Sequence, residues 1–348
     1  MAYATISKPS LHYNTKLYTG NGSTQSITGL GFQPDLNWIK CRDVSENHNI
    51  SDSVRGDSGA NSGYYYITPN ANDMQGSGSG NTYVSSLDAD GFSIGNNDVV
   101  NTNAQPFISW NWKANGAGSA NTDGTINSTV SANTIAGFSI VKWTATGSAS
   151  TIGHGLGVAP KMIIGKRLDS AGSWLTYHAS LDATDFIKLH DTAATEDNDT
   201  VWNDTEPTSS VFSVGTGFPA GTFIAYCFAD VAGFSKMGSF EGNLNADGPF
   251  VYTGFKPTFL LLKNADNSAS GDEWFMEDAT RSTYNPTGKK LSANISNAET
   301  TGSWVDIDFL SNGFKIRTSD QGLNEHTMIY MAFGQTMVGT NDVPATAR

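Results

Sequence analysis

Three pairs of acidic residues are the part of this sequence that could do chemistry. They lie in the segments Asp88-Ala89-Asp90-Gly91, Asp272-Glu273 and Asp306-Ile307-Asp308. Two carboxyl groups that flank a sugar can cleave a glycosidic bond, one as an acid and the other as a base or nucleophile. A simpler interpretation fits the first and third pairs, because Asp90-Gly91 predicts a tight Asx-Gly turn and alternation places Asp306 and Asp308 on the solvent face of one strand. The pattern therefore predicts no catalytic residues.

Metal binding is the second chemistry to consider. Asp88 and Asp90 lie in one polar loop, and Asp197 and Asp199 lie in another. Clustered carboxylate oxygens suit a hard cation, so these four residues are the candidate ligands for Ca²⁺. The histidines show no His-x3-His spacing and neither cysteine is close to another ligand, so nothing indicates zinc. We expect no other cofactor.

Nucleophilic and phosphate-binding motifs are missing from the sequence. The segment Gly153-His154-Gly155-Leu156-Gly157 is rich in glycine, but it precedes a strand and a proline rather than the start of a helix. It therefore lacks the amide cradle that holds phosphate, and we interpret it as a β-turn. No Gly-x-Ser-x-Gly elbow is present. These features favour a protein that is not an enzyme.

Aromatic residues could instead bind a sugar ring by stacking. Trp110 and Trp112 point the same way on one strand, and their counterparts further along the chain are also apolar, so we expect them in the core. Less constrained aromatics are the candidate glycan-binding residues: Tyr64, Tyr65, Tyr66, Trp174, Trp202 and Trp274, with Trp304 beside them. If the protein binds a glycan, some of these should be exposed.

The elements that position these residues form an internal repeat. Gly-x-x-Pro occurs at Gly31 to Pro34, Gly157 to Pro160 and Gly254 to Pro257. Each copy runs into an apolar strand ending in lysine, at Leu36 to Lys40, Met162 to Lys166 and Phe259 to Lys263. Each repeat closes on an aromatic strand, at Phe107 to Trp112, Phe223 to Phe228 and Met328 to Phe333. The same landmarks in the same order three times indicate a tandem array of one β-unit.

Short strands separated by glycine and polar turns, with no long helical periodicity, predict an all-β fold. We expect three related β-sandwich (jelly-roll-like) domains in tandem. The predicted parts are an N-terminal arm (1–16), repeat 1 (17–114), a Gly/Ser/Asn-rich linker (115–134), repeat 2 (135–234) and repeat 3 (235–348). Because almost no linker separates repeats 2 and 3, we expect these two to pack together while repeat 1 stands apart.

Charge and composition exclude several partners. The net charge is −13 and no block of basic residues is present, so nucleic acid and anionic membranes are poor partners. No apolar run approaches the roughly 18 residues of a membrane span, and the N-terminal segment has no signal-peptide core, so we expect folding in the cytoplasm. Cys41 and Cys227 lie in different repeats and predict two buried free thiols.

Several phrases resemble a family of uncharacterised proteins from tailed bacteriophages, especially marine and cyanobacterial phages. They are Lys16 to Ser23, Gly31 to Leu36, Asp52 to Gly56, Tyr252 to Pro257 and Leu310 to Lys315, and the resemblance covers about residues 5 to 335. The resemblance implies a structural protein of the virion that forms a homo-oligomer there and contacts other virion proteins. It implies no catalytic residues.

The sequence contains no shaft-like coiled coil or β-helical repeat, and its first repeat starts within about 20 residues of the N-terminus. We therefore expect a compact, non-enzymatic protein on the particle surface, tail-associated or capsid-decorating, that contributes to attachment to a host receptor or glycan. The alternative is a tail-fibre or tailspike receptor-binding protein with polysaccharide-degrading activity.

Overall fold

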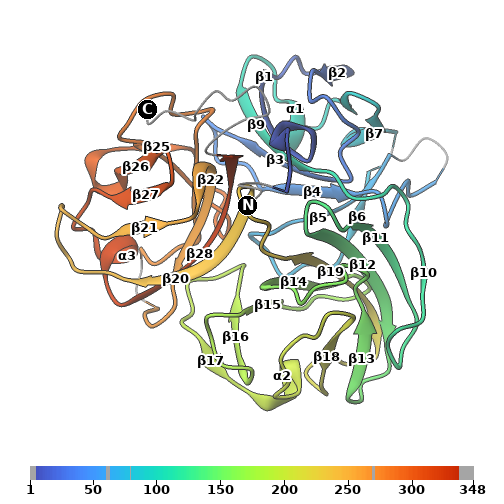
Figure 1. Ribbon diagram of the computed structural model, residues 1–348. Helices are drawn as coiled ribbons and strands as arrows, with labels where there is room; N and C mark the ends of the chain where they lie inside the picture. The colour runs from blue at the N-terminus through green and yellow to red at the C-terminus, as the bar shows by residue number, and fades with distance from the viewer. Residues whose placement is uncertain (1–4, 60–62, 79, 269–270, 337–348) are drawn as a thin grey trace.

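Two antiparallel sheets make up the first repeat in the computed structural model, which describes residues 5–59, 63–78, 80–268 and 271–336 (Figure 1). The larger sheet has the strand order β1 (Tyr13–Thr19), β9 (Pro106–Trp112), β3 (Leu36–Cys41), β4 (Asn49–Asp52), β5 (Tyr65–Ile67) and β6 (Gly76–Ser77). The smaller sheet has the order β2 (Gln25–Thr28), β8 (Gly91–Ile94) and β7 (Val84–Asp88). Ile39, Phe92 and Phe107 belong to the apolar cluster between the two sheets.

Repeat 3 follows the same plan. Its larger sheet has the order β20 (Ser235–Glu241), β28 (Thr327–Thr336), β22 (Phe255–Asn264), β23 (Phe275–Asp278), β24 (Lys289–Ser292) and β25 (Thr300–Thr301). Its smaller sheet has the order β21 (Phe250–Tyr252), β27 (Gly313–Ile316) and β26 (Ile307–Leu310). Short helices complete the two repeats: η1 (Pro9–Leu11) and α1 (Asp98–Asn101) in repeat 1, and η2 (Ser303–Val305) and α3 (Gln321–Asn324) in repeat 3. The all-β sandwich fold is confirmed.

Repeat 2 has a wider sheet than its neighbours. The order is β10 (Ser119–Asn121), β11 (Ser128–Asn133), β12 (Phe138–Ala145), β19 (Gly221–Phe228), β14 (Met162–Arg167), β15 (Trp174–His178), β16 (Asp185–Lys188) and β17 (Glu196–Asp197). β13 (Ser150–Gly153) and β18 (Val211–Val214) form the smaller sheet, and α2 is Asp199–Trp202. The segment 115–134 is therefore not a linker, because β10 and β11 extend this sheet through backbone hydrogen bonds that need no apolar side chains.

The Gly-x-x-Pro block acts as a turn, as predicted. Gly31, Gly157 and Gly254 have φ angles of 84°, 75° and 83°, in the left-handed region that favours glycine. In all three repeats the turn leads from the smaller sheet into a buried strand of the larger sheet. The block is therefore part of the scaffold.

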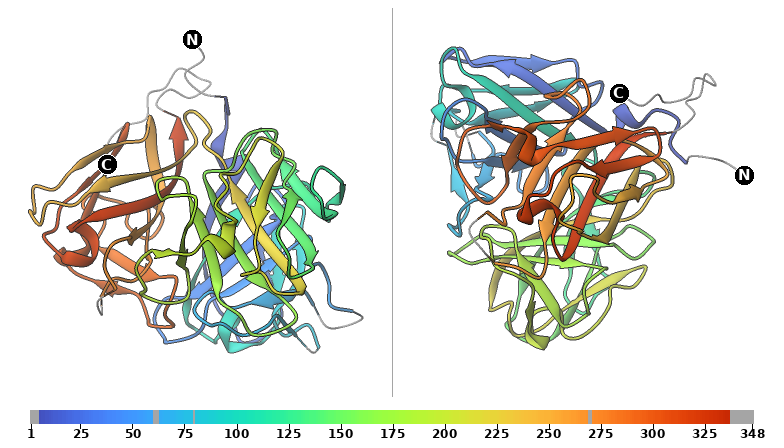
Figure 2. Two further views of the ribbon diagram at one scale, coloured as in Figure 1. Left: turned by 90° about the horizontal axis from the view of Figure 1, so that it is seen from below. Right: turned by 90° about the vertical axis from the view of Figure 1, so that its left-hand side faces the viewer.

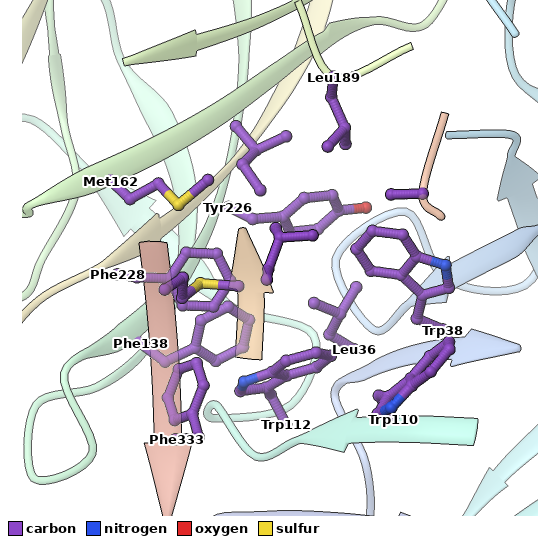
Figure 3. Packing of buried hydrophobic residues seen from close by; sticks show 14 of the residues in the cluster. Leu36, Trp38, Trp110, Trp112, Phe138, Met162, Leu189, Tyr226, Phe228 and Phe333 are labelled. Atoms are coloured by element: carbon purple, nitrogen blue, oxygen red, sulfur yellow. The ribbon is translucent and has the colours of Figure 1, made fainter. Parts of the chain in front are cut away.

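A central core joins the three repeats. The larger sheets turn their outer faces toward one another, and an apolar cluster with members from every repeat fills the space between them (Figure 3). Trp112, Phe228 and Phe333 occupy equivalent positions on β9, β19 and β28. Their ring centroids form a nearly equilateral triangle with sides of 6.1, 6.0 and 5.8 Å. This triangle marks a pseudo-threefold axis, and the predicted core role of the closing aromatic strands is confirmed.

Backbone hydrogen bonds repeat the same symmetry at the three interfaces. Each bond is donated by the residue just before the edge strand of the larger sheet, β6, β17 or β25. It is accepted by the carbonyl two residues after the strand lysine of the next repeat. The bonds run from Gln75 N–H to the Leu168 carbonyl (3.0 Å), from Thr195 N–H to the Ala265 carbonyl (2.7 Å) and from Glu299 N–H to the Arg42 carbonyl (2.6 Å). The repeats thus form a closed ring, 1 to 2, 2 to 3 and 3 to 1. Repeat 1 does not stand apart, and in both views of Figure 2 the three repeats lie side by side.

Buried polar groups tie the ring further. Asp52 pairs with Arg55 and accepts a hydrogen bond from the Tyr226 hydroxyl of repeat 2 at 2.8 Å. In the equivalent place Asp278 pairs with Arg281, and the Trp110 indole of repeat 1 donates to it at 3.4 Å. Because the charges are buried, each carboxylate depends on its arginine and on the neighbouring repeat.

The N-terminal arm is shorter than predicted. Ile6 is buried in the central core, and the Thr5 N–H bonds to the Ala232 carbonyl at 3.4 Å. β1 begins at Tyr13, so residues 13–16 belong to the first sheet rather than to the arm. Both cysteines, Cys41 and Cys227, are buried and free, which confirms the prediction of free thiols.

Candidate binding hollows

Each repeat carries a surface hollow at the same place in its fold. The hollow holds about 500 Å³ in repeat 3, about 340 Å³ in repeat 2 and about 160 Å³ in repeat 1. Glu273, Ser173 and Asn47, which come just before β23, β15 and β4, line the three hollows respectively. Lys290, Phe186 and Tyr66 line them from the next strand, at equivalent register. The repeat thus builds one kind of site three times.

Buried lysines support the loops around two of these hollows. Lys40, Lys166 and Lys263 are the next-to-last residues of the central strands of the three repeats, and all three are fully buried. The Lys166 ammonium donates to the carbonyl of Gly172 at 2.9 Å, and that of Lys263 to the carbonyl of Asn267 at 3.4 Å. Gly172 and Asn267 line hollows. Lys166 and Lys263 therefore hold the loop backbone at their hollows, whereas the Lys40 ammonium donates to the carbonyl of its neighbour Cys41 at 2.7 Å.

Burial has a cost for these ammonium groups. Removal from water lowers the pKa of Lys40, Lys166 and Lys263 to about 8. The charges of Asp73 near Lys166 and of Asp272 near Lys263 oppose this shift. The recurrence of lysine at one position in three repeats was the signal of a structural role.

The hollow of repeat 3 combines an aromatic ring with acidic and basic groups. The Lys290 ammonium lies 4.7 Å from the Trp304 ring centroid and 4.1 Å from that of Phe275, and 3.7 Å from Glu273 Oε2. Asp320 caps α3 by accepting from the Gly322 N–H at 3.0 Å. Burial lowers the pKa of Lys290 and raises that of Asp320. Trp304 is 39% exposed, so a ligand can reach the indole together with hydrogen-bond donors and acceptors.

The hollow of repeat 1 is aromatic in a different way. The rings of Tyr66 and Tyr83 stack with centroids 4.1 Å apart, and Asn47 and Asp73 contribute polar groups. Burial raises the pKa of the Tyr66 hydroxyl. All three tyrosines predicted to bind glycan, Tyr64, Tyr65 and Tyr66, are half-buried, and the hollow includes Tyr66.

The lining of the repeat 2 hollow includes a charged pair over an aromatic ring. Lys188 forms an ion pair with Glu196, and its ammonium lies 5.7 Å from the Phe186 ring centroid. Val201 and Pro219 extend the apolar part of the lining. The three hollows therefore share a position but differ in chemistry.

Trp174, Trp202 and Trp274 are buried, which corrects the expectation that they can stack on a sugar. Trp202 packs inside repeat 2 against Tyr177, with ring centroids 6.0 Å apart. The other two join repeats: the Trp174 indole donates to the Ala71 carbonyl at 2.9 Å, and the Trp274 indole to the Lys188 carbonyl at 2.8 Å. The large side chains of Trp174 and Trp274 therefore belong to the interfaces between repeats.

Two of the four candidate calcium ligands, Asp88 and Asp90, accept hydrogen bonds within repeat 1. Asp90 accepts hydrogen bonds from the N–H groups of Gly29 (3.0 Å) and Gly31 (2.6 Å), which lower its pKa and brace the first Gly-x-x-Pro turn. Asp88 accepts from the Ser93 hydroxyl at 2.8 Å. Asp197 belongs to β17 and Asp199 to α2. Within the described ranges, no group of three or more His, Cys, Asp or Glu residues is placed to hold a metal ion.

Comparison with known proteins identifies a family. The model of a family described as "Domain of unknown function (DUF7483)" matches residues 8–336. The chain belongs to this family. The match spans all three repeats of the ring. No curated protein matches the chain. In the part of the chain that the structure describes, no helix is long and apolar enough to cross a membrane.

Proposed function

We propose that the protein is a non-enzymatic structural component of a bacteriophage particle, exposed on the particle surface, where it contributes to attachment to host-surface glycans. The observation that carries the binding part is the triple occurrence of one hollow on a closed ring, with a partly exposed aromatic ring beside polar groups in the hollows of repeats 1 and 3. Such a combination suits sugars, whose C–H faces stack on aromatic rings while their hydroxyls bond to polar side chains. The sequence resemblance supports the placement on a phage particle, tail-associated or capsid-decorating.

A binding role fits the acidic residues better than a catalytic one. Asp320 is occupied as a helix cap, and Glu273 faces the Lys290 ammonium. In the pair Asp306 and Asp308, the second carboxylate forms an ion pair with Arg317 at 3.3 Å. An acid and a base for glycoside cleavage need one carboxyl that keeps its proton and another that is free to react.

One observation favours the alternative, a receptor-binding protein that degrades polysaccharide. Asp272, Glu273 and Asp320 line the same hollow as Trp304. Incubation of the purified protein with host-surface polysaccharide tests this alternative directly. Release of reducing ends that is lost in Glu273→Gln would replace the non-enzymatic proposal.

The binding proposal is tested with host-surface polysaccharide and three single variants. Trp304→Ala and Tyr66→Ala remove the rings of two hollows, and Tyr284→Ala removes a ring that is 80% exposed and lies outside the hollow linings. We expect a loss of affinity of about tenfold or more in at least one hollow variant and none in Tyr284→Ala. Equal affinity in all four proteins would contradict binding in the hollows. Gold-labelled antibody on intact virions tests the particle location, and unlabelled virions would refute it.

A further inference from the structure

An aromatic pair lies outside the hollows, on the outer face of the smaller sheet of repeat 3. Phe250 and Tyr252 of β21 are 45% and 54% exposed, while Val251 between them is buried. Since side chains alternate along a strand, the two rings share the solvent face. Neither residue belongs to the lining of the repeat 3 hollow.

The fold itself does not require these rings. Val251, Ile27 and Ile152 are equivalent, because each is buried opposite the phenylalanine of the neighbouring strand. The residues on either side of that position are Ser26 and Thr28 in repeat 1, and Thr151 and Gly153 in repeat 2. Two repeats thus complete the same sheet with small side chains, and only repeat 3 exposes aromatic rings there.

The local packing holds both rings on the sheet. A Cβ at Gly313 would lie 3.1 Å from the Phe250 ring, so the ring rests on the glycine of the next strand. The Lys236 ammonium donates to the Tyr252 carbonyl at 2.9 Å and lies 5.7 Å from the Tyr252 ring centroid. Rings held in this way lose little conformational entropy when a ligand stacks on them.

Lys315 and Arg317 beside the rings are paired with carboxylates, and Lys236 donates to a backbone carbonyl. Lys315, the partner of Phe250 across the strands, contacts Asp247 at 2.9 Å. Arg317 contacts Asp308 at 3.3 Å and Asp247 at 3.8 Å. The face therefore offers hydrogen-bond donors and acceptors without a large excess of one charge. This favours an uncharged ligand rich in hydroxyl groups over a polyanion, which needs clustered unpaired cations.

We propose that the outer face of β21, β27 and β26 is a second carbohydrate-binding surface, which takes an uncharged stretch of polysaccharide across Phe250 and Tyr252. This inference rests on the proposed function in assuming that the protein meets glycans. It adds a second binding surface outside the hollows and a ligand class, uncharged polysaccharide, for that surface. Phe250 and Tyr252 stack on sugar rings, and the paired side chains of Asp247, Asp308 and Arg317 bond to hydroxyls.

The test copies the surface of repeat 1 onto repeat 3. Phe250→Ser with Tyr252→Thr installs the residues that repeat 1 has at the same positions, and both sites are exposed, so the fold should be retained. Affinity electrophoresis through gels with dextran, mannan or laminarin uses neutral probes, and alginate serves as the anionic comparison. We expect neutral polysaccharide to retard the wild type and the double variant to bind about tenfold or more weakly.

Two further variants separate this proposal from the previous one. Trp304→Ala with Tyr66→Ala should leave retardation by the neutral polysaccharide unchanged, because these residues belong to the hollows. Ser26→Phe with Thr28→Tyr should add a second neutral-glycan surface to repeat 1. The proposal is overturned if the double variant binds like the wild type, or if none of the neutral polysaccharides retards the wild type. It is also overturned if the double variant only changes self-association, since the face would then bind a second copy.

Discussion

Replacing a buried strand lysine should change how the stability of the protein depends on pH. Lys166 is the best choice, because its ammonium is fully buried and has defined carbonyl partners, Gly172 at 2.9 Å and Asn72 at 3.2 Å. Burial lowers its pKa from 10.5 to about 8 in the folded protein. Between these two values the unfolded chain binds more protons than the folded chain, so the free energy of unfolding rises with pH.

The size of the effect follows from the shift. One pKa unit corresponds to about 1.4 kcal/mol, so moving from pH 7 to pH 9 should add about 1 kcal/mol for each lysine of this kind. Lys166→Met should lose this contribution. At pH 7 the variant should have nearly the stability of the wild type, because removing a buried charge stabilises the protein while the two carbonyls lose a donor, at about 1–3 kcal/mol each. The triple variant at Lys40, Lys166 and Lys263 should lose about 3 kcal/mol of pH-dependent stability.

Urea unfolding at pH 7, 8 and 9 measures this difference. Comparing wild type with variant cancels the contributions of the cysteines and tyrosines, which both proteins share. Lys161→Met is the control, since Lys161 is exposed. If the stability of wild type and Lys166→Met changes in parallel over this pH range, or if Lys161→Met changes the slope as much, the buried-ammonium explanation is refuted.

Three other outcomes are expected. Trp112→Ala should lower the free energy of unfolding by about 3–5 kcal/mol, because Trp112 contacts Phe228 and Phe333 of the other repeats. Trp304→Ala should lower it far less. Equal losses for the two variants in thermal unfolding would contradict the central core. Limited proteolysis should spare the segment 115–134, because β10 and β11 pair with the sheet of repeat 2; rapid cleavage there would restore the linker interpretation. Gly157→Ala should lower the free energy of unfolding by only about 1–2 kcal/mol through backbone strain, because nothing lies within 4 Å of the added Cβ. At Gly91 the added Cβ would lie 1.9 Å from the Ile27 carbonyl oxygen. Chemical denaturation should therefore rank Gly91→Ala as clearly more destabilising.

The sequence predicted the repeat unit well because local chemistry determines it. The Gly-x-x-Pro turns, the central strands and the closing strands with Trp112, Phe228 and Phe333 depend on residues close together in the chain. The ring was not predicted, because its closure depends on contacts such as that from Glu299 N–H to the Arg42 carbonyl, which join repeat 3 to repeat 1. Repetition of a pattern indicates like units without saying how they pack.

The candidate site was predicted only in part. Tyr66 and Trp304 were recognised as aromatics that could meet a glycan, and both line hollows. Trp174 and Trp274 were assigned to the same class although they are buried, because composition around a tryptophan does not reveal a neighbouring repeat. For Trp174 the spacing from the strand lysine does contain a signal, whereas Trp274 follows Lys263 by eleven residues. Trp174 follows Lys166 by eight residues, and His48, which hydrogen-bonds to the Ser292 carbonyl of repeat 3, follows Lys40 by the same number.

The pseudo-threefold ring has a consequence for how its sites can change. In a trimer of identical chains, every substitution appears three times, and dilution favours separated subunits. Here one chain closes the ring, so assembly is intramolecular and does not depend on concentration. Each hollow is encoded by its own stretch of sequence, and the chain presents a tyrosine stack, an ion pair over phenylalanine and a tryptophan beside carboxylates in a fixed one-to-one-to-one ratio. One hollow can change its lining while the other two keep theirs.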